Sequence, residues 1–207
     1  MLKLYYSPGA CSLASHIALE ESGAPYTTQR VDLKSGEQRT PDYLKINFKG
    51  RVPALVTDRG VLTENPAILA YIAQNFPKAD LADLGDSFAF AEMQAFNLYL
   101  ATTVHVAFTH VFRPTRYADG EDTAAAMRVK CSAAIDDSFT AIGEKLSDGR
   151  PFVHGDRYTL SDPYLLVFSR WLDRANLGPV DKFPLVAAHR KRIEARPAVQ
   201  KVFATES

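Results

Sequence analysis

Cysteine is scarce in this sequence, with Cys11 and Cys131 the only two thiols among 207 residues. Two cysteines cannot form a disulfide framework, which is typical of a reducing compartment, so we expect a cytoplasmic protein. Leu13 and Ala14 follow Cys11 and Ser12. The two-thiol redox motif of thioredoxins is therefore excluded, and a disulfide at Cys11 would need a thiol from another molecule.

Net charge and long apolar stretches are also missing. Lys and Arg together number 24, as do Asp and Glu, so the charge balance does not indicate a nucleic-acid partner. The basic run His189–Arg192 fits a solvated helix face. No apolar stretch approaches the roughly 20 residues that cross a bilayer, and the N-terminus lacks a signal-peptide pattern. We therefore expect neither nucleic acid nor a membrane as a partner, and no metal.

Strand and helix patterns alternate in the first 80 residues. Residues 2–6 alternate as in a half-buried strand, a helical pattern follows and ends at Gly23, and residues 26–31 are rich in β-branched and aromatic side chains. This order predicts a parallel β-α-β unit. Residues 52–56 and 61–63 then predict a β-hairpin. The other expected elements of this half are helices over residues 41–46 and 66–76.

The pattern is only helical from Ser87 onward. Thr159 and Asp162 have the spacing of a capping box. Cys131 lies on the apolar stripe of its helix, so we expect a buried, inert thiol there. Residues 78–86 show no strand pattern and predict a linker between the two halves. The expected helices cover residues 88–112, 122–146, 160–178 and 185–196, and a short one follows Pro197.

Residues 5–16 join the first strand to the first helix and place Cys11 at the helix start. Free backbone N–H groups and the positive end of the helix dipole stabilise a thiolate there, which predicts a lowered pKa for the Cys11 thiol and a reactive cysteine. A lone cysteine is equally well a small buried hydrophobic residue. The position alone does not decide between these two interpretations.

Two prolines mark further positions of interest. Pro53 lies at the start of an apolar strand, where it cannot donate a ladder hydrogen bond, so it belongs at a strand entry and is a candidate for a cis peptide bond. Pro66 follows Asn65. This pair predicts that Asn65 caps a helix and that Pro66 occupies its first position.

The resemblance of this sequence to the cytosolic glutathione transferases, most closely the bacterial beta class, is carried by residues 5–16, 47–55 and 62–68. It spans the whole chain and continues through His105 and the capping box at Thr159. The resemblance implies an α/β plus all-α protein, with a thioredoxin-like glutathione-binding domain over residues 1–80 and an all-helical domain over residues 87–207 that lines the electrophile pocket. It also implies a homodimer and glutathione as co-substrate.

The resemblance places the γ-glutamyl end of glutathione at Glu64 and Asn65. Helix N-terminal N–H groups bind a carboxylate, and Glu64 can pair with the ligand ammonium. An acid immediately before a cap is more than capping needs, which favours ligand binding. The backbone of Val52, entering the edge strand at Pro53, matches the position that pairs with the cysteinyl part of glutathione like an added strand. Lys34 is the candidate for the lysine that this family has nearby.

Three residues match positions around the glutathione sulfur. Cys11 matches the beta-class cysteine that faces the sulfur, and Tyr5 matches a nearby tyrosine that is not the main thiol activator in this class. His105 matches the histidine that lines the pocket from the helical domain, placed to hydrogen-bond the sulfur or polarise a substrate. Around it the sequence departs from the beta-class pattern, with Thr103 and Val106 where an acid and a lysine are usual.

Three functions are compatible with these residues. The first is a transferase that lowers the pKa of the glutathione thiol and adds the thiolate to a small hydrophobic electrophile. The second makes Cys11 the chemical centre of a glutathione thiol transferase or peroxidase, through a mixed disulfide. The third is a non-catalytic ligand-binding stress protein, which Thr103 and Val106 favour. The candidate lining of the electrophile pocket is Phe108, Phe112 and Trp171.

Overall fold

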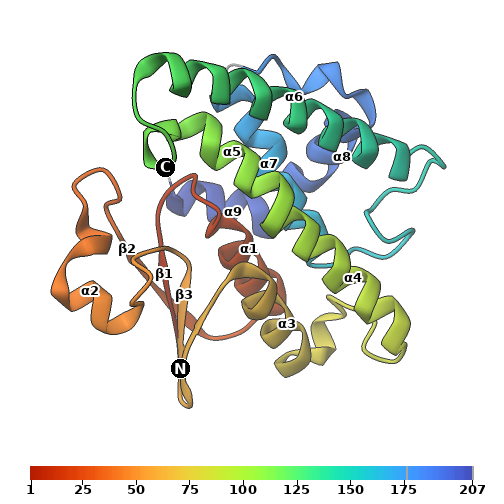
Figure 1. The fold of residues 1–207 in the computed structure, drawn as a ribbon. Coiled ribbons are helices and arrows are strands. Elements are labelled where there is room, and N and C mark those ends of the chain that lie inside the picture. Colours follow the sequence, from red (N-terminus) through yellow and green to blue (C-terminus); the bar gives the residue numbers. More distant parts are fainter. Residues whose placement is uncertain (176, 207) are drawn as a thin grey trace.

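The computed structural model describes residues 1–175 and 177–206 and folds them into a sheet-containing half and a helical half (Figure 1). Asn176 and Ser207, both in the expected helical domain, lie outside the described residues. The first half contains β1 (Leu2–Tyr6), α1 (Leu13–Ser22), β2 (Tyr26–Arg30), α2 (Pro41–Ile46), β3 (Ala54–Thr57), β4 (Gly60–Thr63) and α3 (Asn65–Asn75). The second half contains α4 (Ser87–Tyr99), α5 (His105–Phe112), α6 (Glu121–Lys145), α7 (Ser161–Arg174), α8 (Pro184–Glu194) and α9 (Pro197–Glu206).

The four strands form one sheet in the order β2-β1-β3-β4. β1 and β2 pair in parallel across α1, and β3 pairs antiparallel with both β1 and β4, so the predicted β-α-β unit and hairpin are confirmed. Leu2, Leu4 and Tyr6 are the buried side chains of β1, as the alternation indicated. Gly23 ends α1 in a left-handed conformation, with φ +66°, and its N–H donates to the Glu20 carbonyl.

The strand predicted over residues 52–56 begins later, at Ala54, and ends at Thr57. Pro53 has no N–H to donate to the ladder, which delays the start of regular pairing. The Val52–Pro53 peptide bond is cis, as the sequence indicated. The chain therefore enters β3 through a short irregular segment that faces the loop after β1.

The helix predicted over residues 88–112 is interrupted by the π-helical turn η3 (Leu100–Val104). Within this turn the His105 N–H donates to the Leu100 carbonyl, five residues back. A π turn inserts one residue and changes the direction in which the following side chains point, and such turns occur frequently at functional sites. His105 is the first residue after it. None of the described helices combines the length and the apolar character needed to cross a bilayer.

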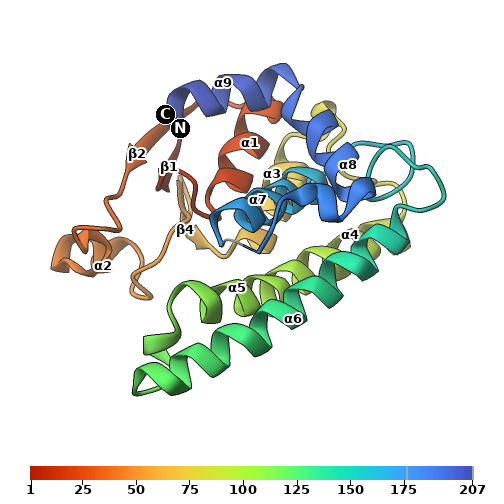
Figure 2. The same cartoon turned by 90° about the horizontal axis from the view of Figure 1, so that it is seen from above.

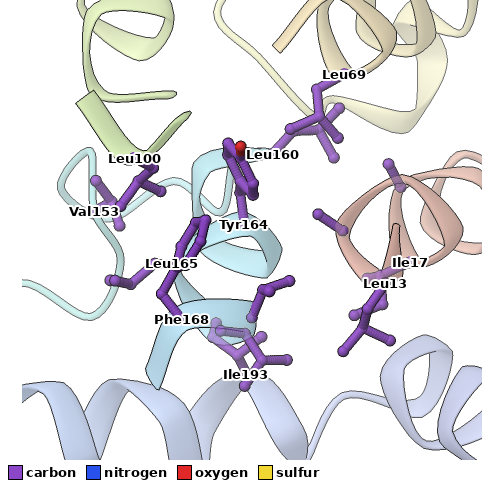
Figure 3. Close-up of a cluster of buried hydrophobic side chains, with 14 of the residues drawn as sticks. Leu13, Ile17, Leu69, Leu100, Val153, Leu160, Tyr164, Leu165, Phe168 and Ile193 are labelled. Carbon is purple, nitrogen blue, oxygen red and sulfur yellow. The ribbon is translucent and has the colours of Figure 1, made fainter. Parts of the chain in front are cut away.

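α7 is the buried centre of the molecule and lies between α1 on one side and α5 and α6 on the other (Figure 2). Its side chains Tyr164, Leu165 and Phe168 are at most 1% exposed, and side chains from both halves surround them (Figure 3). One continuous core therefore joins the two halves. The surrounding residues labelled in Figure 3 are Leu13, Ile17, Leu69, Leu100, Val153, Leu160 and Ile193.

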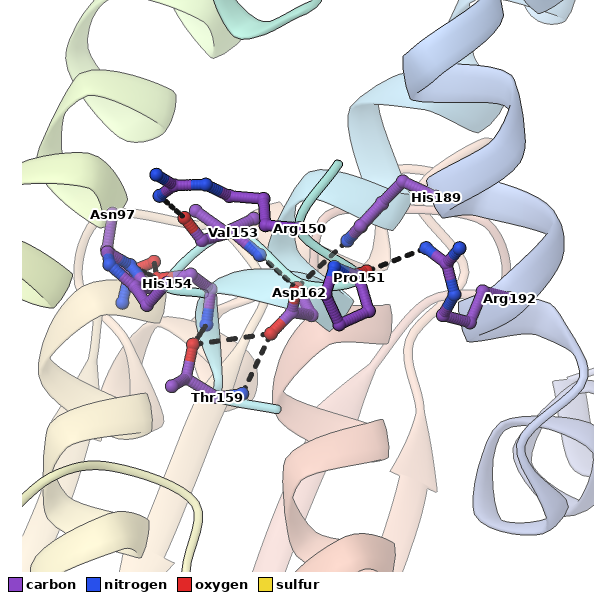
Figure 4. Close-up of polar contacts among 10 residues, drawn as sticks. Asn97, Arg150, Pro151, Val153, His154, Thr159, Asp162, His189 and Arg192 are labelled. Carbon is purple, nitrogen blue, oxygen red and sulfur yellow. Dashed lines mark hydrogen bonds and ion pairs between the residues drawn. The ribbon is translucent and has the colours of Figure 1, made fainter. Parts of the chain in front are cut away.

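The start of α7 is held by the predicted capping box (Figure 4). The Asp162 Oδ2 accepts from the Thr159 N–H at 2.8 Å and from the Thr159 hydroxyl at 3.3 Å. Its Oδ1 accepts from the Val153 N–H and lies against His189 Nε2, both at 2.9 Å. Asp162 and His189 are 0% and 1% exposed. Half of the predicted box is confirmed: Asp162 accepts from the Thr159 N–H, but the Asp162 N–H donates to the Thr159 carbonyl and not to its hydroxyl. Asp162 also ties the preceding loop and α8 to α7.

The predicted linker and the predicted end of α7 both need correction. Leu81 and Ala82 are each 4% exposed, and the Leu160 N–H donates to the Leu81 carbonyl at 3.1 Å. The segment over residues 78–86 is thus partly packed into the core instead of running as a spacer. α7 ends at Arg174, before the expected stop at Gly178.

The prediction of a buried Cys131 is wrong. This thiol is only partly buried on α6, two residues after Val129, which is 69% exposed. Most of the buried side chains of α6 lie in its C-terminal half, from Ile135 onward. The apolar stripe around Cys131 extends along α6 beyond the main core, so it is covered incompletely. Burial nevertheless raises the pKa of the Cys131 thiol.

Candidate functional site

The loop over residues 7–12 carries Cys11 from β1 to the start of α1. The Ser7 N–H donates to Ser12 Oγ at 3.1 Å, and the Ser12 hydroxyl donates back to the Ser7 carbonyl at 3.3 Å. The Ala10 N–H closes a turn onto the same carbonyl at 3.0 Å. Cys11 therefore precedes α1 directly, as the sequence predicts, in a loop whose shape is held by its own polar groups.

The Cys11 thiol is half-buried and donates to the Val52 carbonyl at 3.4 Å. Burial, with a further contribution from the Glu64 carboxylate, raises the pKa of this thiol to about 12, against the opposing effect of its own N–H and of Asn65. The prediction of a lowered pKa is wrong, because the donors at the helix start do not outweigh lost hydration and a nearby negative charge. At neutral pH Cys11 is an uncharged thiol and a hydrogen-bond donor.

Asn65 does not cap α3, contrary to the sequence interpretation. It is the first residue of the helix, it is 4% exposed, and its side chain points inward. Its Oδ1 accepts from Ser15 Oγ at 2.6 Å, and its Nδ2 donates to the Cys11 carbonyl at 2.9 Å. The Asn65 side chain thus bonds to Ser15 on α1 instead of capping its own helix. Asn65 consequently fixes the loop that carries Cys11 against the start of α3.

Glu64 stands immediately before α3 with φ +71°, a conformation that costs a non-glycine residue about 1–3 kcal/mol. Its carboxylate is 62% exposed and pairs with Lys49 Nζ at 2.5 Å. Among the residues that the structure describes, no acceptor is found for the backbone N–H groups of Asn65 and Ala67. An exposed carboxylate beside open N–H donors can bind the ammonium and the carboxylate of one ligand.

Lys49 is a candidate site residue that the sequence did not indicate. Besides Glu64 it reaches Thr63 Oγ1 at 2.7 Å. The only signal for it was its place inside the segment 47–55, which faces the end of the hairpin. Lys34, the lysine chosen from the sequence, is exposed after β2, and its backbone N–H donates to Asp32 at 2.9 Å. In the described part of the chain, its side chain contacts none of the other candidate residues.

Val52 and Pro53 form the wall opposite Cys11. Val52 is 7% exposed, and its carbonyl accepts from the Cys11 thiol. The preceding carbonyl, of Arg51, accepts from the Tyr43 hydroxyl at 2.8 Å and from Asn47 Nδ2 at 2.7 Å. These two bonds hold the backbone on the N-terminal side of the cis peptide, so the Val52 backbone is presented in a fixed position.

Tyr5 lies in β1 beside this wall. Its ring is 5.9 Å from that of Tyr43 in an edge-on arrangement, and Lys3 Nζ lies 4.9 Å from its ring centre. Together with Ala10 it packs against the small apolar cluster that contains Val52. Among the described residues the Tyr5 hydroxyl makes no hydrogen bond to Cys11. The structure therefore brings Tyr5 close to the site but gives it a packing contact there.

His105 enters the site from the helical half. Its ring packs edge-on against Trp171, with 5.1 Å between ring centres. Burial, followed by the Arg51 guanidinium, lowers the pKa of His105 to about 4, and the Glu64 carboxylate opposes this. His105 is therefore neutral at pH 7. Arg51 and Glu64 also act on the pKa of the Cys11 thiol, so these four groups lie near one another where the two halves meet.

The three aromatic residues proposed from the sequence come together beside His105. Phe108 lies 5.8 Å from Phe112 and 5.6 Å from Trp171, and Phe112 lies 5.5 Å from Trp171. Phe108 is fully buried, Trp171 is 7% exposed, and Phe112 is 38% exposed. The cluster thus has a buried base and an open rim.

Two hollows of the molecule are lined by residues other than Cys11, Glu64 and His105. The first borders the candidate site, because Gly9 belongs to the loop that carries Cys11 and Trp171 packs on His105. The first has a volume of about 170 Å³ and is lined by Gly9, Leu13, Val167, Arg170, Trp171, Asp173, Arg174 and Arg190. The second has a volume of about 490 Å³ and is lined by Glu21, Ala79, Asp80, Leu81, Asp156, Arg157, Tyr158 and Arg196.

The fold and the candidate site together define a class of protein. A thioredoxin-like sheet presents a cis proline opposite a thiol, and the helical half contributes a histidine that packs on an aromatic cluster. Sequence profiles agree with this architecture. The profile of the glutathione S-transferase N-terminal domain matches residues 1–74, and that of the glutathione S-transferase C-terminal domain matches residues 86–197.

Comparison with individual proteins also finds glutathione transferases. Glutathione S-transferase GstA of Escherichia coli O157:H7 is 36% identical over 207 residues, covering 99% of this chain and 98% of the relative. A glutathione transferase homologue from Sulfitobacter, crystallised with bound glutathione, is 37% identical with a TM-score of 0.92, covering 99% and 98% of the two chains. The beta-class enzyme of Sphingomonas chungbukensis is 34% identical with a TM-score of 0.87, again covering 99% and 98%. The chain belongs to the glutathione S-transferase family, is an enzyme of that family, and is close to its bacterial beta-class members.

Proposed function

We propose that this enzyme binds glutathione along Glu64, Asn65 and Val52 and adds its thiolate to small apolar electrophiles. The observation that carries the proposal is the start of α3. There a strained residue presents an exposed carboxylate beside N–H groups for which the described residues supply no acceptor. Strained backbone persists where the surrounding structure and the function require it. The Sulfitobacter homologue, crystallised with bound glutathione, supports the choice of ligand.

The γ-glutamyl end supplies both charges that this helix start can bind. The ligand carboxylate accepts from the N–H groups of Asn65 and Ala67, and the ligand ammonium pairs with Glu64 in place of Lys49. The cysteinyl backbone pairs with the backbone of Val52, which Pro53 leaves unpaired on that side. This arrangement points the ligand sulfur toward Cys11. We keep Lys34 as a binding candidate from the sequence alone.

Thiol activation in this scheme depends on groups around the ligand sulfur. With its pKa raised to about 12, Cys11 remains protonated and donates a hydrogen bond to the glutathione thiolate. The positive charge of Arg51 lowers the pKa of the bound thiol, and neutral His105 donates from the other side. The sulfur then forms a bond to the electrophilic carbon, the leaving group departs with its electron pair, and the thiol proton passes to water. Tyr5 supports the wall of the site.

The aromatic cluster indicates the second substrate class. Phe108, Phe112 and Trp171 offer a buried base and an open rim, which suits a small apolar and preferably planar electrophile. Val106 is 44% exposed beside this region, and Thr103 is also exposed. Neither residue supplies the charge that beta-class members usually have there. The binding of glutathione therefore depends mainly on contacts from the sheet-containing half.

Cys11-dependent thiol transfer or peroxidase activity is the second candidate function, because the thiol lies in the candidate site opposite Val52. Its raised pKa makes it a weak nucleophile at neutral pH and favours conjugation. A non-catalytic stress protein that holds apolar ligands is the third, and the exposed Val106 is the observation in its favour.

The broader organisation is also part of the proposal. We propose a thioredoxin-like domain over residues 1–80, an all-helical domain over residues 87–207 and a homodimer in the cytoplasm. Exposed apolar side chains support the dimer: Phe48 is 83% exposed, and on α4 Phe88 and Leu98 are 72% and 50% exposed. Light scattering at micromolar concentration tests it, and a monomeric mass would contradict it.

Replacement of the Cys11 thiol separates conjugation from disulfide chemistry. We expect Cys11→Ala to retain conjugation of glutathione to an aromatic halide within about tenfold, because the variant loses one hydrogen bond to the sulfur. Reduction of a glutathione mixed disulfide should disappear if it occurs in the native enzyme. Cys131→Ala is the matched control and should change neither rate. Loss of conjugation to the uncatalysed level in Cys11→Ala alone would contradict the proposed mechanism.

A further inference from the structure

We propose that Glu206, in the last turn of α9, is a positioning residue of the glutathione site that clamps the loop carrying Cys11. Its Oε2 accepts from the Gly9 N–H at 3.2 Å, although the two residues are 197 positions apart in the chain. Its Oε1 lies 2.8 Å from His16 Nδ1 on α1. The side chains of Glu206 and His16 are only 6% and 1% exposed. The end of the chain thus reaches the loop that precedes the first helix.

The other side of the same loop residue is held by α7. The Gly9 carbonyl accepts from Trp171 Nε1 at 3.0 Å and from Arg174 Nη1 at 2.5 Å. Gly9 has φ +65°, and a Cβ at this position would lie 3.0 Å from Arg174 Nη1. Both polar groups of Gly9 are therefore held by the helical half, two residues before Cys11, and a side chain at this position would be strained.

Glu206 is not needed to attach α9 to α1. Lys201 on α9 already pairs with Glu20 on α1 at 2.6 Å, and the α9 side chains Val199 and Val202 are at most 1% exposed. A carboxylate that is nearly buried costs free energy unless it is paired and hydrogen-bonded. Here both of its oxygens are engaged with groups outside its own helix. The contact that distinguishes Glu206 from the other docking residues is the bond to the Gly9 N–H.

The clamp also links the two substrates of the proposed reaction. Trp171, which donates to Gly9, lies 5.1 Å from the His105 ring and 5.5 Å from the Phe112 ring. One indole therefore borders the proposed electrophile pocket and holds the loop that positions Cys11. This inference rests on the proposed glutathione site. In that site, release of Gly9 would let Cys11 move away from the Val52 carbonyl and from the ligand sulfur.

Three variants of the full chain test the clamp. Glu206→Ala removes both hydrogen bonds. Glu206→Gln preserves both contacts: its amide oxygen accepts from the Gly9 N–H, and its NH₂ donates to His16 Nδ1 when the imidazole carries its proton on Nε2. Lys201→Ala is the matched control, since it breaks a pair between the same two helices without touching the loop. Amide-resolved hydrogen exchange at Gly9, calorimetry with glutathione and the free energy of unfolding are measured on each variant.

We expect Glu206→Ala to speed exchange at Gly9 by about tenfold or more and to raise the Kd for glutathione by about three- to tenfold. Glu206→Gln should restore both values to within about twofold, and Lys201→Ala should leave both unchanged, whatever its effect on stability. Unchanged exchange at Gly9 in Glu206→Ala, an effect on Kd matched by Lys201→Ala, or failure of Glu206→Gln to restore either value would overturn the proposal.

The exchange measurement keeps this test separate from that of the proposed function. If the native protein fails to bind glutathione, the proposed function is wrong, and exchange at Gly9 still shows whether Glu206 clamps the loop. If glutathione binds and Glu206→Ala changes exchange without changing Kd, Glu206 holds the loop for structural reasons alone and its positioning role is rejected.

Discussion

The starts of α7 and α3 each carry an acidic side chain, and the two acids lie in opposite environments. At the start of α7, Asp162 is fully buried and receives hydrogen bonds from Thr159, Val153 and His189. At the start of α3, Glu64 is strained and exposed, and it makes no capping bond to the backbone. The carboxylate at the first helix start is fully satisfied within the protein, whereas the carboxylate at the second is exposed beside N–H groups for which the described residues supply no acceptor.

From this difference we infer that the start of α7 serves stability and propose that the start of α3 serves ligand binding. A helix has N–H groups without intrahelical partners at its start, and a protein that leaves them unsatisfied gains an anion site at some cost in stability. Asn65 could have capped α3, but its side chain is used to fix Ser15 and Cys11 instead. We therefore expect changes at α7 to affect folding and changes at α3 to affect glutathione binding.

The largest effect is expected at the start of α7. Asp162→Ala should lower the free energy of unfolding by about 3–5 kcal/mol, because it leaves His189 and two backbone N–H groups buried without their acceptor. Denaturant unfolding measures it. Asp86→Ala is a matched control, because Asp86 caps α4 at an exposed position through the N–H groups of Phe88 and Ala89, and its loss should cost about 1 kcal/mol. Equal costs in the two variants would remove the distinction drawn for α7.

The next effect is expected at the start of α3. Glu64→Ala should raise the Kd for glutathione by about 10- to 100-fold, because it removes a charged partner of the ligand ammonium. The free energy of unfolding should change by less than about 1 kcal/mol, since the exposed pair with Lys49 contributes little. Calorimetry and denaturant unfolding measure the two quantities.

The control for this change is Glu121→Ala. Glu121 also lies in the first turn of a helix, is 75% exposed and pairs with Arg128 at 2.7 Å. We expect its replacement to leave the affinity for glutathione unchanged. The assignment of α3 fails if Glu64→Ala binds glutathione as tightly as Glu121→Ala, or if its loss of binding accompanies global unfolding.

A smaller effect is expected on the alkylation rate of the Cys11 thiol. With a pKa of about 12, the rate of Cys11 alkylation should rise about tenfold per pH unit between pH 7 and 9 without reaching a plateau. Cys131 is partly buried, and burial raises its pKa without the further effect of a nearby carboxylate, so it should react at least as fast at pH 7. Peptide mapping after limited alkylation measures both rates. A plateau for Cys11 below pH 9 would show that the helix start does stabilise its thiolate.

The raised pKa of the Cys11 thiol also predicts that the stability of the protein depends on pH. The Cys11 pKa is higher in the folded state, so its contribution to stability is complete below the ordinary value of 9.0 and is lost as pH rises toward about 12. Cys11→Ser should show a shallower loss of stability over that range. Identical pH profiles for the two proteins would mean that burial does not hold the thiol protonated.

The elements of the fold were largely predictable, because local patterns specify them. Alternating burial in β1 and the left-handed Gly23 are local signals, and both are confirmed. The spacing of Thr159 and Asp162 is a local signal too, and the bond from the Thr159 N–H to Asp162 is confirmed. The cis bond before Pro53 is likewise confirmed. The break at Leu100–Val104 has no such signal, since no proline or glycine marks the turn.

The site was less predictable, because its chemistry depends on tertiary neighbours. The position of Cys11 before α1 followed from the sequence, but its raised pKa depends on burial and on Glu64, more than 50 residues away. The inward turn of Asn65 depends on Ser15, and the role of Lys49 depends on the hairpin bringing Glu64 within reach. None of these pairs is close in sequence, so no local pattern could reveal them.

A titration of the protein with glutathione, followed by amide-resolved NMR, tests most directly whether the start of α3 is the ligand site. The account predicts that the Asn65 and Ala67 amide signals shift and saturate together, because these N–H groups gain the ligand carboxylate as acceptor. The Thr159 and Asp162 amide signals at the start of α7 should stay in place, since that helix start is already satisfied. Saturating glutathione that leaves the Asn65 and Ala67 signals unmoved would contradict the account.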